Sequence, residues 1–131
     1  MKRIFIGCVR VAVVASLAFL AAPSPAASSR LKTITCPYLK GGSVSFAVPA
    51  KLGALPEVNV DYPAKATLFN FRDGQLLLVA VDEGDPSRLR VVVSAQFNKR
   101  SRAYDGQIVV DMGGNQLQLH SGPVRCTVDA G

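Results

Sequence analysis

Hydrophobic and polar residues alternate along two segments in the C-terminal half of the chain, residues 89–97 and 107–112. A period of two places one set of side chains on a buried face and the other toward water, so both segments are predicted to be strands. In the first segment the buried set is predicted to be Leu89, Val91, Val93, Ala95 and Phe97. A polar loop over residues 98–106 joins the two strands, and this pair is the most distinctive unit of the sequence.

Similar short patterns recur on both sides of this pair. The sequence predicts further strands over residues 31–36, 43–48, 65–71, 76–81, 116–120 and 124–128, and the long connection over residues 49–63 could hold one short extended piece at 57–60. Asp73-Gly74 is favoured in tight hairpin turns, and Ser121-Gly122-Pro123 is predicted to form the last turn. Thr67, Phe69 and Phe71 are expected to share one face of their strand.

Seven or eight short strands, with no helical pattern after the N-terminal segment, predict an all-β fold. We expect a small antiparallel barrel that is closed or nearly closed, with a two-sheet β-sandwich as the alternative. Cys36 and Cys126 stand in the first and last predicted strands, so a disulfide between them would tie the barrel together. Two separate buried thiols are the alternative for this pair.

The first 26 residues have the pattern of a secretory signal peptide. Three cations, Lys2, Arg3 and Arg10, precede an uncharged apolar run over residues 11–22. The small residues Ser24 and Ala26 follow this run. A membrane anchor is the alternative, but the run is shorter than the ~20 apolar residues that span a bilayer. We therefore expect one domain over residues 27–131, periplasmic or secreted, with no membrane span.

Removal of this leader changes the charge of the protein. Three of the 15 cationic residues lie in the leader, and none of the 9 acidic residues does. Residues 27–131 therefore carry twelve cationic and nine acidic residues, a net charge of +3. So small an excess does not indicate a nucleic-acid-binding protein.

Residues that could carry catalysis are scarce. His120 is the only histidine, and no serine stands in a nucleophile-elbow context. The acidic run Asp82-Glu83-Gly84-Asp85 could hold calcium, but its spacing differs from that of a twelve-residue calcium loop and a hairpin turn is favoured. The sequence therefore predicts neither an enzyme, nor a cofactor, nor a metal site.

The loop over residues 99–104 is the candidate binding site. Lys99, Arg100 and Arg102 lie within four residues, together with Ser101 and Tyr104. Three cations could contact phosphate, sulfate or an acidic glycan, and Tyr104 could add a stacking face. The alternative is a loop tip whose charges only keep the protein soluble.

The order of these features resembles that of the membrane-bound and periplasmic inhibitors of c-type lysozyme. In that family a cysteine opens the domain, a strand leads into a Ser-Gly-x-x-Tyr-like loop, a Lys-Gly turn follows, and a second cysteine comes near the end. Thr35-Cys36-Pro37 resembles the opening, Ser101-Arg102-Ala103-Tyr104 the loop, and Gln116-Leu117-Gln118-Leu119 through Cys126 the closing segment. Arg102 replaces the family's glycine, and Met112 replaces the lysine before the turn glycine.

The resemblance implies a small exported β-barrel whose loop enters the lysozyme cleft. Ser101 would contact the catalytic carboxylates of the enzyme, and Tyr104 would shape the loop. The predicted function is thus that of an exported non-enzymatic binding protein that inhibits c-type lysozyme through loop 99–104. The alternative is a periplasmic or surface domain that binds an anionic polymer or glycan.

Overall fold

The computed structural model describes residues 31–38 and 41–130, and the predicted signal peptide lies outside this part of the chain. Eight strands form: β1 Thr33–Pro37, β2 Ser43–Ala47, β3 Glu57–Asn59, β4 Ala64–Arg72, β5 Gln75–Asp82, β6 Leu89–Asn98, β7 Ala103–Asp111 and β8 Leu119–Asp129. No helix in these residues is long and apolar enough to cross a bilayer.

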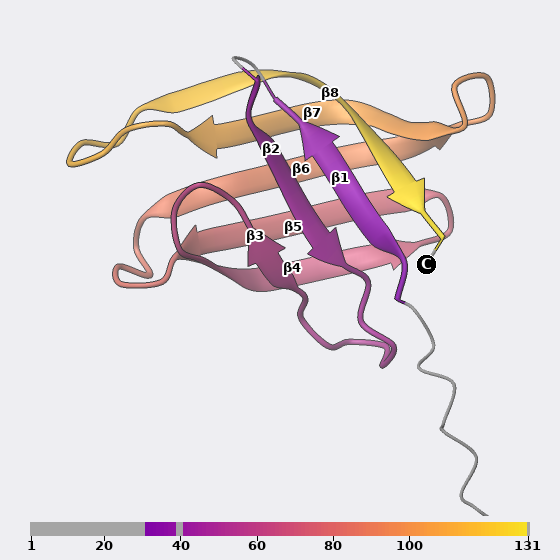
Figure 1. Cartoon of the computed structure of the whole chain (residues 1–131), viewed down its shortest axis with the longest axis horizontal. Coiled ribbons are helices and arrows are strands. Elements are labelled where there is room, and N and C mark those ends of the chain that lie inside the picture. Colours follow the sequence, from indigo (N-terminus) through magenta and orange to yellow (C-terminus); the bar gives the residue numbers. More distant parts are fainter. Residues whose placement is uncertain (1–30, 39–40, 131) are drawn as a thin grey trace, which may run out of the picture.

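The strands form a closed antiparallel barrel in chain order (Figure 1). Each strand pairs with the next, and β1 closes the barrel by pairing with β8 from Thr33↔Asp129 to Thr35↔Thr127. The barrel prediction is confirmed, and the sandwich alternative is wrong because one continuous sheet returns to its first strand.

Alternation along the strands builds the core. In β6, Val91, Val93 and Ala95 are buried, as the period of two predicts, whereas Leu89 is only half-buried and Phe97 is 46% exposed, contrary to the prediction. The continuously apolar β5 obeys the same rule, because Leu76, Leu78 and Ala80 are buried while the residues between them are only half-buried. Its outer face is therefore partly open to solvent.

A disulfide joins Cys36 in β1 to Cys126 in β8, with an S–S distance of 2.10 Å and a Cα–Cα distance of 4.2 Å. Both cysteines are fully buried in the core. The bond crosses the seam at which the barrel closes and links positions 90 residues apart in the chain. Disulfides of this kind persist in oxidising compartments.

Two local predictions are wrong, for different reasons. A register shift between Ala66 and Leu68 interrupts β4, so Thr67 is exposed while Phe69 and Phe71 pack against the core. The predicted turn at Ser121-Gly122-Pro123 is instead part of β8, where Pro123 lies opposite Gln107. Proline fits there because β1 pairs only with the far end of β8, which leaves this stretch as a sheet edge.

Connections alternate between the two ends of the barrel, because every neighbouring pair is antiparallel. Residues 48–56, 73–74 and 99–102 connect strands at one end, which we call the hairpin end. Residues 60–63, 83–88 and 112–118 do so at the other, which we call the opposite end. In Figure 1 the turns of the hairpin end that follow β4 and β6 lie on the right, and the opposite end lies on the left.

Two arginines and two aspartates form a cluster of ion pairs at the opposite end. The Asp111 carboxylate is fully buried, and its Oδ2 accepts hydrogen bonds from Arg88 Nε at 2.6 Å and Arg90 Nη1 at 3.2 Å. Arg90 also pairs with Asp82 and stacks over the Tyr62 ring at 4.6 Å. Burial alone would raise the pKa of Asp111, but hydrogen bonds from Arg88 and from the backbone N–H groups of Gln118 and Gly113 lower it to about 2.

Candidate functional site: the cationic hairpin

The predicted loop is a tight hairpin between β6 and β7. Its turn is confined to residues 99–102, and the backbone N–H of Arg102 donates to the Asn98 carbonyl at 2.8 Å. Arg102 has a φ of 54°, in the left-handed region that glycine adopts most readily. We call residues 98–105 the cationic hairpin.

The turn is shorter than predicted, because β7 begins at Ala103 and includes Tyr104, Asp105 and Gly106. Asp and Gly are weak strand formers, so the sequence favours a loop over these residues. Gly106 is needed for close approach, since a Cβ there would collide with the backbone of Ser94 and Ala95. Tyr104 is therefore a strand residue and does not belong to the turn.

Hydrogen bonds within the hairpin hold its shape. Asp105 Oδ2 accepts from Asn98 Nδ2 at 2.9 Å and from the Ser101 hydroxyl at 3.2 Å, while Arg125 Nε donates to Oδ1 at 2.7 Å. The bond from Arg125, and next that from Asn98, lowers the pKa of Asp105, so this carboxylate stays ionised. Ser101, one of the predicted contact residues, is thus half-buried and bonded within the hairpin.

The three predicted cations point outward. Lys99, Arg100 and Arg102 are all exposed, and none of them forms an ion pair with a carboxylate of the described residues. The nearest carboxylate in sequence, Asp105, is already paired with Arg125. The hairpin therefore presents uncompensated positive charge on a backbone that its own hydrogen bonds hold in place.

Three aromatic side chains pack against one another next to the cationic hairpin. The half-buried Tyr104 ring lies 5.2 Å from Phe71 and 5.4 Å from Phe97, measured between ring centroids. Phe97 is 46% exposed, so one ring of this row faces solvent beside the cations. Tyr104 therefore packs against both phenylalanine rings next to the turn.

The sequence missed the residues that hold the hairpin. Asn98 and Asp105 flank the turn, and the sequence pattern predicts only that they lie in a loop, although a polar pair on either side of a turn can bond across it. Arg125 could not be identified, because it lies 20 residues beyond Asp105 and only the register of β7 and β8 brings the two together.

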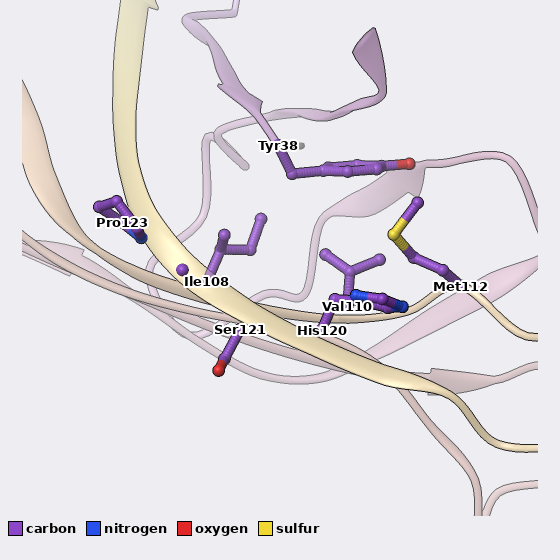
Figure 2. A pocket seen from close by; sticks show the side chains of 8 residues that line it. Tyr38, Ile108, Val110, Met112, His120, Ser121 and Pro123 are labelled. Atoms are coloured by element: carbon purple, nitrogen blue, oxygen red, sulfur yellow. The ribbon is translucent and has the colours of Figure 1, made fainter. Parts of the chain in front are cut away.

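The other candidate residues do not form a chemical site. Asp82 accepts hydrogen bonds from the backbone N–H groups of Gly84 and Asp85 and pairs with Arg90, so the acidic run is a hairpin turn. No group of three His, Cys, Asp or Glu side chains among the described residues is placed to hold a metal ion. His120 lines a small, shallow pocket, and Figure 2 shows it beside Met112 with Tyr38 across the pocket.

No protein-family model, no curated protein and no solved structure matches this chain.

Proposed function

We propose that this chain is an exported, non-enzymatic binding protein that inhibits a c-type lysozyme through the cationic hairpin. The observation that carries the proposal is the set of three exposed cations, without described carboxylate partners, on a turn held by its own hydrogen bonds. A binding element that is ordered before it meets its partner loses little conformational entropy on binding. An acidic cleft is the surface that such a turn complements.

Two further observations support the resemblance to the lysozyme inhibitors. The fold is a small β-barrel whose first and last strands are joined by a disulfide. Arg102, which stands where that family has glycine, has the positive φ that suits a glycine. The substitution therefore keeps the turn and adds a cation to it.

Electrostatics restricts where this hairpin can bind. A lysozyme of this class is itself basic, so the three cations are repelled by most of its surface and attracted only where carboxylates gather. Ser101 would have to release its hydroxyl from Asp105, to which it donates at 3.2 Å, before it could bond a carboxylate of the enzyme. The cations would then supply most of the binding energy.

The first test is a turbidity assay with a c-type lysozyme. We expect near-stoichiometric inhibition by the purified domain. Replacing Lys99, Arg100 and Arg102 together with glutamine should weaken inhibition by roughly thirtyfold, or about 2 kcal/mol. Ser101→Ala and Tyr104→Ala should each weaken it less, through a lost contact and a less rigid hairpin.

A matched variant tests whether inhibition depends on where the three cations lie or only on the total charge of the protein. Lys32, Lys51 and Lys65 are exposed and lie outside the hairpin, and their joint replacement by glutamine removes the same charge. This variant should inhibit like the wild type. Absence of inhibition by the wild type at high excess, or equal losses in both triple variants, would contradict the proposal.

A second candidate function is favoured by Phe97. Its ring is 46% exposed and packs on Tyr104 next to the three cations, so it offers a flat apolar face beside positive charge. An anionic glycan could stack a sugar on such a face and place its acidic groups on the cations.

Retention on an anionic glycan column tests this candidate. We expect retention to fall as salt rises, because exposed charges are screened. It should vanish in the hairpin triple variant and fall in Phe97→Ala, while the Lys32, Lys51 and Lys65 variant keeps most of it. Retention that is insensitive to the hairpin residues would reject it.

A further inference from the structure

A leucine occupies the tip of the connection between β2 and β3. Residues 51–54 form a tight turn in which the Ala54 N–H donates to the Lys51 carbonyl at 3.2 Å and Gly53 has a φ of 83°, as in a type II turn. Leu52 takes the outer corner and is 81% exposed, the largest exposure among the large hydrophobic residues of the described chain. Turn corners usually carry Gly, Pro, Asn, Asp or Ser, so this leucine requires an explanation.

The loop that carries Leu52 is packed against the barrel. Residues from the segment 48–54 line a shared cleft with Phe69 and Phe71 of β4. Phe71 in turn contacts Tyr104, so this loop and the cationic hairpin share one aromatic support. Leu52 is therefore held outward by its turn at the same end of the barrel as the cations.

Charge is distributed unequally between the two ends. The connections of the hairpin end carry the cations Lys51, Lys99, Arg100 and Arg102 and a single carboxylate, Asp73. The described connections of the opposite end carry Asp61, Glu83 and Asp85 against Arg88 alone. Among these described connections the hairpin end is net positive and the opposite end net negative, which favours an approach of the hairpin end to a negative surface.

From this arrangement we propose that the hairpin end docks on an anionic lipid surface, with Leu52 inserted below the headgroups and the four cations lying among them. Each Lys or Arg near such a surface makes the free energy of membrane binding more favourable. An inserted apolar side chain adds a contribution to this free energy that does not depend on salt. Neither contribution alone gives stable attachment, and both are present at this end.

The opposite end provides an internal control. Leu117 is 55% exposed there, in a connection whose own residues are uncharged and whose one neighbouring cation, Arg88, is paired with Asp111. If exposed leucine alone caused lipid binding, Leu52 and Leu117 would contribute comparably. The proposal requires that only Leu52 does so.

Sedimentation with vesicles tests the proposal. The protein used is residues 27–131, which contain all eight strands and the disulfide but lack the apolar leader. Vesicles of phosphatidylglycerol and phosphatidylcholine in equal parts should bind it, and pure phosphatidylcholine vesicles should bind it weakly. Leu52→Ser should lower the partition coefficient about tenfold, and the Lys99, Arg100 and Arg102 triple variant about a hundredfold on the anionic vesicles.

The outcomes separate this proposal from lysozyme inhibition. Leu52→Ser should leave inhibition unchanged, and Leu117→Ser should leave both vesicle binding and inhibition unchanged. The lipid proposal fails if the wild type does not bind the anionic vesicles, if Leu52→Ser binds them like the wild type, or if Leu117→Ser weakens binding equally. A Leu52→Ser variant that loses inhibition but not vesicle binding would assign the leucine to a protein partner instead.

Discussion

Replacing Asp111 with asparagine is expected to lower the free energy of unfolding by about 3–5 kcal/mol. The Asp111 side chain is fully buried and neutralises Arg88 and Arg90, whose side chains are only 17% and 8% exposed. Asparagine could still accept the backbone hydrogen bonds from Gly113 and Gln118, but it would leave Arg88 without its carboxylate partner. Urea unfolding followed by circular dichroism measures the loss.

Asp105→Asn is the control for this prediction. It also removes a carboxylate from an arginine pair, but Arg125 is 62% exposed and water can solvate it. Its unfolding midpoint should change far less than that of Asp111→Asn. Equal shifts in the two variants would show that burial is not what makes Asp111 important.

The stabilising effect of Asp111 should weaken in acid. Its pKa is about 2 in the folded barrel against an ordinary value of 3.8, so the folded state favours the ionised form. The stabilisation is complete above pH 3.8 and is lost as the pH falls toward about 2. The difference in unfolding free energy between the wild type and Asp111→Asn should therefore become smaller across that interval, and a constant difference would contradict the assignment.

Removing the disulfide is the second change with a large expected effect. Replacing Cys36 and Cys126 with alanine opens a cross-link between positions 90 residues apart. Chain-entropy considerations give a loss of about 4–5 kcal/mol in the free energy of unfolding. Chemical denaturation of the variant measures it.

Reduced wild-type protein is the comparison for this variant. It lacks the cross-link but keeps both sulfur atoms in the core, so the difference between the two samples reports the packing of the sulfurs. A double variant as stable as the oxidised wild type would mean that pairing between β1 and β8 closes the barrel without help.

The features that the sequence predicted correctly depend on local patterns. Val91, Val93 and Ala95 are buried because a strand alternates its side chains, and that rule needs no knowledge of the partner strand. The disulfide followed from two cysteines in a segment predicted to be exported. The positions of Lys99, Arg100 and Arg102 on an exposed turn followed from a polar run between two strands.

The features that were missed depend on register. Arg88 meets Asp111 across 23 residues, and no local pattern indicates which carboxylate a given arginine will face. The irregularity after Ala66 reverses the face of Thr67, and it is invisible in a segment whose residues are all acceptable in a strand. Pro123 lies within a strand because its neighbour β1 is short, which is a property of another part of the chain.

The seam between β1 and β8 also bears on how the molecule is made. Seven of the eight strand pairings join neighbours in sequence and can form as the chain grows, but the eighth joins the start of the domain to its end. During synthesis β8 is the last of the eight strands to emerge, so every shorter piece of the domain has an open sheet with two unpaired edges. Closure of the barrel, and the oxidation that joins Cys36 to Cys126, must wait until β8 has emerged.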